Sequence, residues 1–169
     1  MATTGDAMMI DLRPATDADV REFVAWRYDA PYDAYDIAMA PAEAVTDCLG
    51  AEVRCHTLVD ADEVVGFCTF GTDAQVPGGD YTGDALDIGL GVKPSRTGSG
   101  NGHQFVAAVV EHAKGTFGPR LFRVSIAAGN ERALRVWSNA GFSEISRFDT
   151  NRELMGSTEF AILVREVSG

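Results

Sequence analysis

Residues 86–114 read LDIGLGVKPSRTGSGNGHQFVAAVVEHAK, and this stretch decides the fold. Its first seven residues alternate apolar and small side chains, which predicts a strand. Pro94 ends that strand, and a loop with glycines at 98, 100 and 102 follows. Apolar residues then recur at helical spacing up to Ala113. A strand, a glycine loop and a helix in this order are typical of a phosphate-binding site, because converging backbone N–H groups and the helix dipole attract anions.

The glycine spacing selects among phosphate-binding motifs. A dinucleotide fingerprint needs glycines at its first, third and sixth positions, and a Walker loop needs Gly-Lys-Ser/Thr where this chain has Gly102-His103. The stretch resembles motif A of the GNAT superfamily of acyl-CoA N-acyltransferases, Arg/Gln-x-x-Gly-x-Gly/Ala. Gly100 and Gly102 match its two small positions, and Thr97 stands where the motif has Arg or Gln. The alternative is a flexible turn without a ligand.

A second signature of the same family lies further along the chain. Residues 130–142 read NERALRVWSNAGF and resemble Asn-x-x-Ala-x-x-x-Tyr-x-x-x-Gly-Phe. The matching residues are Asn130, Ala133, Gly141 and Phe142, with Trp137 at the tyrosine position. Two signatures at this separation are far more specific than either alone. The resemblance covers essentially the whole chain, 1–169, as a single N-acetyltransferase domain.

The resemblance implies a mixed α/β fold with a central, mostly antiparallel, splayed sheet of six or seven strands flanked by about four helices. The residue patterns predict strands at 10–14, 53–59, 64–70, 86–92, 121–127, 144–150 and 158–165. Helices are expected after the cap residue Thr16, from Pro41 to a stop at Gly50, after Gly102, and from Asn130 to a stop at Gly141. The segments 26–36 and 71–85 are the least constrained.

The chain length and the net charge indicate one acidic domain. The chain has 169 residues and a net charge of −11, and a chain of this length buries ~70% of its unfolded surface. The negative charge argues against nucleic acid or an anionic membrane as partner. It suits a cationic amine, although acidity for solubility alone explains it equally well. Coenzyme A is itself an anion, so its binding needs local positive charge, for which Lys93, Arg96, Arg132 and Arg135 are candidates.

Three cysteines, Cys48, Cys55 and Cys68, lack the spacing of metal ligands. Their odd number, together with no basic, apolar leader in residues 1–9, indicates reduced thiols in the cytosol. A symmetric hairpin over residues 53–70 would bring Cys55 and Cys68 near each other as free, buried thiols. No apolar run approaches the length of a membrane span. We therefore expect a cytoplasmic protein without a bound metal.

The resemblance implies acetyl-CoA as cosubstrate and assigns residues to it. Backbone groups of Leu90 and Val92 should pair with the pantetheine arm, and the glycines at 89 and 91 either keep that region clear or mark a bulge. Asn130 is expected to begin the last helix and to hydrogen-bond the arm through its side-chain amide. Trp137 is expected to pack along the arm. The diphosphate is expected at the loop residues Thr97, Gly98, Gly100, Asn101 and Gly102.

Transfer of an acetyl group needs a neutral amine, whose alkyl ammonium form has a pKa near ~10. In the GNAT family a carboxylate on this strand often acts as the base, so Asp87 is the candidate, and orienting the substrate ammonium is its alternative role. The family's usual acid is a tyrosine at the position of Trp137, whose indole N–H cannot supply a proton. The remaining donors are solvent and four tyrosines, Tyr28, Tyr32, Tyr35 and Tyr81. We place Tyr81 and Tyr32 with Asp87 among the catalytic candidates.

The acceptor side should involve the two least constrained segments. Residues 26–36 hold three tyrosines, one tryptophan and three aspartates, and aromatic walls with carboxylates attract cations. We expect Tyr28, Tyr32, Tyr35 and Gln75 to contact the acceptor. For each segment a plain structural role, covering the core edge or connecting two strands, is equally consistent with the sequence.

These patterns together predict an acetyl-CoA-dependent N-acetyltransferase acting on a primary amine of a small, cationic molecule by direct transfer in a ternary complex. One alternative is a CoA-binding sensor or adaptor without turnover, motivated by Trp137. The other is a protein-lysine acetyltransferase. An exposed closing strand could pair two chains into a homodimer.

Overall fold

The computed structural model describes residues 8–50, 54–98, 100–154 and 156–167, the side chains at 151 and 152 excepted. The strands are β1 (Ile10–Pro14), β2 (Arg54–Asp60), β3 (Glu63–Phe70), β4 (Leu86–Val92), β5 (Leu121–Ala127), β6 (Ser143–Leu154) and β7 (Ser157–Glu166). The α-helices are α1 (Asp17–Val24), α2 (Pro41–Cys48), α3 (Gly102–Phe117) and α4 (Glu131–Asn139). Three short 3₁₀ turns are η1 (Tyr32–Tyr35), η2 (Thr72–Ala74) and η3 (Pro94–Arg96).

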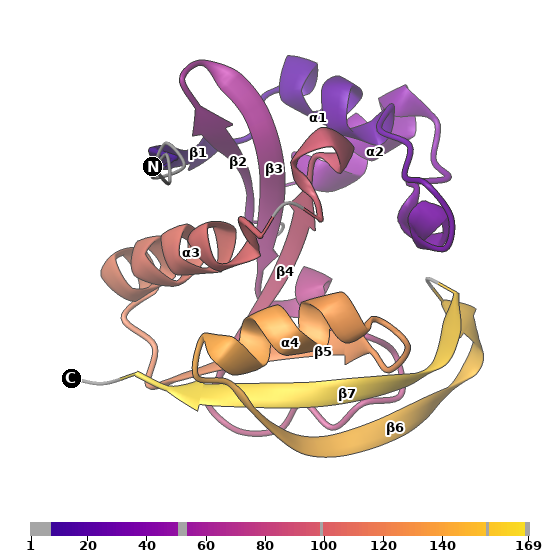
Figure 1. The fold of residues 1–169 in the computed structure, drawn as a ribbon, viewed down its shortest axis with the longest axis vertical. Coiled ribbons are helices and arrows are strands. Elements are labelled where there is room, and N and C mark those ends of the chain that lie inside the picture. Colours follow the sequence, from indigo (N-terminus) through magenta and orange to yellow (C-terminus); the bar gives the residue numbers. More distant parts are fainter. Residues whose placement is uncertain (1–7, 51–53, 99, 155, 168–169) are drawn as a thin grey trace, which may run out of the picture.

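In the described part of the chain, seven strands form one sheet in the order β1-β2-β3-β4-β5-β7-β6. All neighbours are antiparallel except β4 and β5, which are parallel. Figure 1 shows β1–β4 with α1–α3 in the upper part of the molecule, and β5–β7 with α4 in the lower part. The predicted mixed α/β fold and the mostly antiparallel sheet are confirmed.

The sheet divides between β4 and β5. These strands pair only at Leu86–Phe122, Asp87–Arg123 and Ile88–Val124. Beyond these pairs, β4 continues along β3 and β5 continues along β7. Residues 89–92 are consequently half-buried although they lie in the middle of the sheet. The expected splay is therefore present, and we call the space between residues 89–92 and 125–127 the gap.

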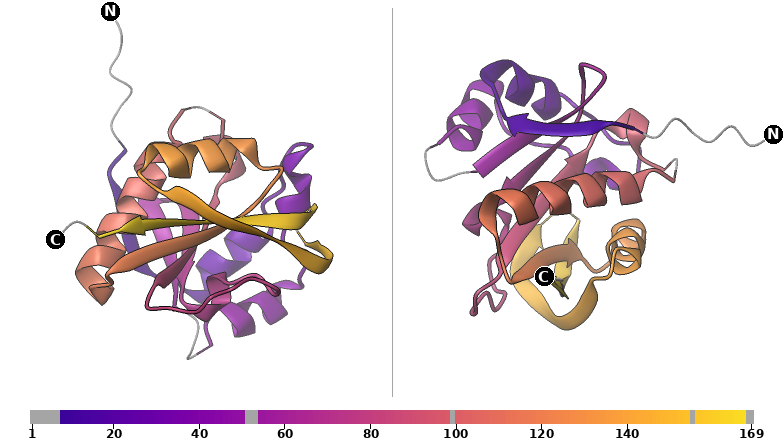
Figure 2. Two further views of the ribbon diagram at one scale, coloured as in Figure 1. Left: turned by 90° about the horizontal axis from the view of Figure 1, so that it is seen from below. Right: turned by 90° about the vertical axis from the view of Figure 1, so that its left-hand side faces the viewer.

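Two apolar layers hold the sheet. The larger packs α3 and α4 on one face, with Phe105, Phe122 and Trp137 among its buried members. The smaller packs α1 and α2 on the opposite face of β2 and β3, where Phe23 stacks on Phe67 with ring centroids 4.5 Å apart. The right-hand view of Figure 2 shows α1 and α2 on one side of these strands and α3 on the other.

Local sequence signals account for most element ends. Thr16 caps α1 through a reciprocal capping box with Asp19. The β2–β3 hairpin turns at Ala61 and Asp62, which both have positive φ. The predicted start of β2 at Val53 lies outside the described residues. Strands β6 and β7 are longer than predicted, because their antiparallel pairing continues to Leu154 and Ser157.

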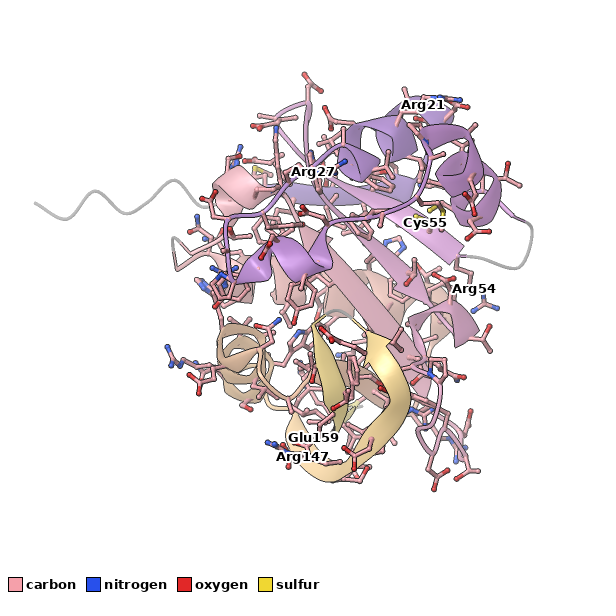
Figure 3. The ribbon with its side chains drawn as sticks, turned by 90° about the vertical axis from the view of Figure 1, so that its right-hand side faces the viewer. Arg21, Arg27, Arg54, Cys55, Arg147 and Glu159 are labelled. Atoms are coloured by element: carbon pink, nitrogen blue, oxygen red, sulfur yellow. The ribbon has the colours of Figure 1, made fainter. Side chains whose placement is uncertain are left out.

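The cysteine arrangement differs from the symmetric hairpin. The register places Cys55 opposite Thr69 and Cys68 opposite His56. Cys48 of α2 hydrogen-bonds Cys55, and this bond lowers the pKa of Cys48 and raises the pKa of Cys55. Figure 3 shows Cys55 beneath the α1–α2 layer. All three described cysteines are free thiols.

Among the described residues, no helix is both long and apolar enough to cross a membrane.

Candidate active site

The backbone of β4 presents one edge to the gap. Gly71 N–H donates to the Asp87 carbonyl at 2.9 Å, and Lys93 N–H donates to the Val65 carbonyl at 2.8 Å. Hydrogen-bonded positions alternate in an antiparallel pair, so the N–H and C=O groups of Leu90 and Val92 point away from β3. They therefore face the gap, as expected for residues that would pair with an extended arm.

The two glycines of β4 make room for side chains of the neighbouring strand β3. A Cβ at Gly91 would lie 2.4 Å from the Phe67 ring, and one at Gly89 would lie 2.8 Å from Thr69 Oγ1. The β3–β4 register contains no shift. The expectation that these glycines clear the gap or mark a bulge is therefore wrong, because they make room for side chains of β3.

One end of the gap is bordered by Tyr28. Its hydroxyl donates to the Val92 carbonyl at 2.7 Å, while its backbone N–H donates to Asp36 at 2.8 Å. Burial, followed by the negative charge of Asp36, raises the pKa of Tyr28 to about 12. The phenol is therefore a firm hydrogen-bond donor at neutral pH.

The glycine loop precedes α3. Gly98 and Gly100 have φ of 71° and 80°, a conformation that favours glycine. The Thr97 hydroxyl donates to the Pro94 carbonyl at 2.7 Å, so its hydrogen is used within the turn. Asn101 is the first residue before the helix and does not cap it with its side chain. Ser99 lies outside the described residues.

Gly102 differs from its expected role. A Cβ there would lie 2.9 Å from Val136 Cγ2 on α4. This glycine is needed for close packing of α3 on α4, rather than for the approach of a ligand to its own Cα. Its backbone N–H still belongs to the first turn of a 16-residue helix, where orphan donors favour anions.

Positive charge at the loop comes from Arg132. It lies over the Tyr32 ring at 4.0 Å, and its Nη1 is 3.3 Å from where a Cβ of Gly98 would be. Among the described residues, no carboxylate forms an ion pair with Arg132. A pocket of about 310 Å³ opens here, lined by Tyr28, Asp29, Ala30, Tyr32, Pro94, Thr97 and Arg132.

Two other expected cations are engaged elsewhere. Lys93 Nζ lies 2.9 Å from Glu63, and Arg96 pairs with both Glu63 and Asp60 at the β2–β3 turn. Their charges are thus largely compensated. Arg135 is exposed on α4.

The second signature positions α4 rather than a cofactor. Asn130 Oδ1 accepts from the Ala133 N–H at 3.1 Å and caps the helix, and the Asn130 side chain also hydrogen-bonds Tyr35. Trp137 is 6% exposed and packs edge-on against Phe142, with centroids 4.9 Å apart. The Trp137 indole is thus part of the core, and its packing along the arm stays a prediction.

Asp87 lies directly below the gap in a buried network. Arg123 donates to both of its carboxylate oxygens at 2.6 and 2.8 Å. Gln75 Nε2 adds a third hydrogen bond at 2.8 Å. Gln75 therefore contacts Asp87, and its contact with the acceptor stays a prediction. The sequence held a signal for this network, since Asp87 and Arg123 are opposite charges in two strands that otherwise read as buried.

Tyr81 joins the loop 71–85 to β5. Its hydroxyl lies 2.6 Å from Ser125 Oγ and accepts from the Val76 N–H at 2.8 Å. The sequence reasoning missed Ser125, because a serine within an apolar strand carries no distinguishing pattern. Val76 is 7% exposed, so this part of the loop is packed rather than solvated.

The remaining acceptor candidates lie where η1 approaches the turn between β6 and β7. Tyr35 of η1 packs against the small apolar cluster of Val76, Ala127 and Phe160. A Cβ at Gly156, between β6 and β7, would lie 2.9 Å from the Ala34 Cβ. The β6–β7 hairpin therefore rests against η1. Tyr32 and Tyr35 are stacked with centroids 6.5 Å apart.

The fold and the gap agree with comparisons against known proteins. The family model described as the GNAT acetyltransferase domain matches residues 9–143. No curated protein sequence matches the chain. The solved structures described next share the fold at less than 25% sequence identity.

Three of these structures show how similar in fold and how distant in sequence they are. A spermidine N-acetyltransferase chimera from Vibrio cholerae is 13% identical, with a TM-score of 0.75 over 93% of this chain and 95% of that one. AAC(6')-Ib in complex with ribostamycin and coenzyme A is 17% identical, with a TM-score of 0.74 over 93% of each chain. Mycobacterium smegmatis RimJ in complex with CoA-disulfide is 18% identical, with a TM-score of 0.70 over 95% of this chain and 83% of that one.

The splayed sheet, the glycine loop before α3 and the family match together lead to one conclusion: the chain belongs to the GNAT acetyltransferase family and is an acyltransferase.

Proposed function

We propose that this chain is an acetyl-CoA-dependent N-acetyltransferase that acetylates a primary amine of a small, cationic molecule by direct transfer in a ternary complex. The observation that carries the proposal is the gap, where Leu90 and Val92 turn their backbone groups away from β3. An extended amide-containing arm can hydrogen-bond there as an added strand would.

The residues around the gap fit the cosubstrate. The positive-φ glycines 98 and 100, the first turn of α3 and the Arg132 guanidinium together suit a diphosphate. When bound, acetyl-CoA supplies the acetyl group as a thioester. Leu90 and Val92 orient its arm, and Arg132 with the loop 97–102 fixes its phosphates.

A cationic acceptor is supported by the aromatic segment 26–36, in which Tyr28 and Tyr35 provide aromatic faces. Asp29 and Tyr32 of the same segment line the pocket that Arg132 also lines, at the loop end of the gap. The chain also carries a net charge of −11, which raises the local concentration of cations. Aminoglycoside and spermidine acetyltransferases share this fold. The identity of the amine is left to experiment.

Asp87 fits a positioning role better than that of the base. Both of its oxygens accept from Arg123, and one also accepts from Gln75. A base must reach the proton that it removes, whereas both oxygens of this buried carboxylate already accept hydrogen bonds from protein side chains. Asp87→Asn tests this assignment: we expect kcat to fall without loss of the acidic limb of the pH–rate profile. Loss of that limb would restore Asp87 as the base.

The proposed function is tested by thiol release from acetyl-CoA with a panel of amines, including polyamines, aminoglycosides, amino acids and a lysine peptide. Sustained turnover with a small amine supports the proposal. Titration calorimetry with coenzyme A runs in parallel. Binding without turnover for any amine would instead indicate a sensor or adaptor, and turnover confined to the peptide would indicate a protein-lysine acetyltransferase.

A further inference from the structure

Acyl transfer from a thioester needs a proton for the departing sulfur, and the α4 position that would hold a tyrosine holds Trp137. That indole is 6% exposed within the core and is not an acid at neutral pH. If the proposed function holds, as this inference requires, another side chain at the gap must provide the proton.

Ser125 stands at the apex of the gap. The last β4–β5 pair is Ile88–Val124, so Ser125 is the first residue of β5 that β4 no longer covers, at the level of Gly89. Ser125 is half-buried, whereas its strand neighbours Val124 and Ile126 are buried. Ser125 is therefore only partly covered at the point where the two strands part.

Tyr81 stands directly behind Ser125. The two hydroxyl oxygens are 2.6 Å apart. The Val76 N–H donates to the Tyr81 oxygen at 2.8 Å, which occupies one acceptor position and leaves the phenolic hydrogen available to Ser125 Oγ. In this arrangement the Ser125 hydrogen has no role within the pair and can be donated toward the gap.

Arg123 can stabilise a negative charge on the Tyr81 phenol oxygen. Its guanidinium carbon lies 5.0 Å from the centroid of the Tyr81 ring, and its Nη2 donates to the Tyr81 backbone carbonyl at 3.2 Å. The bidentate pair with Asp87 holds this guanidinium in place. A phenolate formed at Tyr81 would thus keep the Val76 N–H and have a cation beside its ring.

The other tyrosines are less suited to this task. The Tyr28 hydroxyl is committed to the Val92 carbonyl, and burial raises its pKa to about 12. Burial also raises the pKa of Tyr35. Tyr32 lies beneath Arg132 at the loop, where the diphosphate is expected. Of the four tyrosines, Tyr81 is the one hydrogen-bonded to a residue of β5 at the apex.

We propose that Ser125 is a catalytic residue that protonates the departing sulfur, and that Tyr81 is the positioning and proton-supplying group behind it. The neutral amine forms the C–N bond while the C–S bond breaks and its electron pair passes to sulfur. Ser125 gives its proton to that sulfur and takes the proton of Tyr81. The proton released by the acylated nitrogen returns to the phenolate through solvent, so the amide and the free thiol are the only products.

The test compares Ser125→Ala, Tyr81→Phe, the double variant and Ser125→Cys, which keeps a donor. Thr82→Val is the matched control, because the Thr82 hydroxyl bonds Asp80 at the surface instead of the gap. Steady-state kinetics with acetyl-CoA and the best amine of the panel give kcat, the KM for acetyl-CoA and the pH dependence. Thermal midpoints identify any variant that fails to fold.

We expect Ser125→Ala and Tyr81→Phe each to lower kcat by about 10²-fold, the usual size of an acid–base contribution, with KM changed less than about twofold. The double variant should be no slower than Ser125→Ala alone, because the two residues act as a unit. Tyr81→Phe should lose the alkaline limb of kcat, Ser125→Cys should retain more activity than Ser125→Ala, and Thr82→Val should match the wild type.

Three results overturn the inference. If the wild type turns over while both single variants stay within about threefold of it, the relay is wrong and the proposed function stands. Additive losses in the double variant, with an unchanged pH profile, would make both residues structural. If the wild type shows no turnover with any amine, the proposed function fails and the relay fails with it.

Discussion

The Arg123 guanidinium donates two hydrogen bonds to the Asp87 carboxylate. This pair directly precedes Ile88–Val124, the last pair before β4 and β5 separate. Asp87 is 3% exposed and Arg123 is 5% exposed. The pair therefore joins the two halves of the sheet at the base of the gap, and it also holds the loop that carries Tyr81 through the Thr82 and Tyr81 carbonyls.

Breaking this pair should destabilise the protein strongly. Asp87→Ala leaves the Arg123 charge buried without its carboxylate, which typically costs about 3–5 kcal/mol. Asp87→Asn keeps an acceptor and should lose less. Urea unfolding measures both, with the exposed Asp80→Asn as control. A loss below about 1 kcal/mol for Asp87→Ala would show that Arg123 finds other partners.

Arg132 should matter for the cosubstrate rather than for the fold. Its guanidinium faces the loop and the pocket, so Arg132→Gln should weaken coenzyme A binding by about tenfold, a typical single charge-assisted contact. Titration calorimetry at low and high salt measures this loss. Arg135→Gln, three residues along the same helix on its exposed side, is the control, and equal losses for both would point to a general charge effect.

Gly102 should be intolerant of any side chain because of α4. Gly102→Ala places a Cβ 2.9 Å from Val136 Cγ2, and overpacking of this kind costs about 1–3 kcal/mol. Val136→Ala in the same chain removes the clashing methyl groups and should recover part of the loss. A double-mutant cycle in urea measures the coupling. Independent effects would mean that the glycine is needed for its backbone instead.

Trp137→Tyr should not create a faster enzyme. The indole packs against Phe142 within the core, so a tyrosine there has its hydroxyl among apolar groups rather than at the thioester. We expect a loss of stability, seen as a lower thermal midpoint, and no gain in kcat. Trp137→Phe is the control for lost volume. A rate increase with tyrosine alone would show that position 137 reaches the gap.

Acidification should destabilise the fold through His112. Burial, followed by the nearby His56 with its ring centroid at 4.9 Å, lowers the pKa of His112. The unfolded chain, with a histidine pKa near ~6.5, then binds more protons than the folded one, so stability is full above that value and falls as the pH drops below it.

Thermal midpoints between pH 7.5 and 5.5 measure this dependence. His112→Gln should flatten the curve, whereas His103→Gln, at an exposed site on the same helix, should keep it. An equally steep curve for His112→Gln would place the proton uptake elsewhere.

Elements with strong periodicity were predictable from the sequence. The strand β4 and the strand β5 lie where alternation and apolar runs placed them. The cap residue Thr16 marked the start of α1, where the structure adds a reciprocal capping box with Asp19. These features depend on neighbours in sequence, so one chain is enough to read them.

The candidate site was harder to predict from the sequence, because it depends on contacts across the sheet. Gly89 and Gly91 looked like space for a ligand, yet they accommodate Thr69 and Phe67. Trp137 matched a catalytic position in the family pattern but packs inward. Ser125 gave no signal, since its significance comes from where β4 and β5 part, and strand pairing of this kind is not visible in local composition.

The close approach of Gly156 to Ala34 brings the β6–β7 hairpin against η1, two segments that are far apart in the sequence. Neither part belongs to the central strands that would hold the acetyl donor. Acceptor choice can therefore diverge through exchanges in these two peripheral segments while the donor machinery stays as it is. Chimeras that swap the 26–36 segment and the β6–β7 hairpin together are accordingly the natural route to new acceptors on this scaffold.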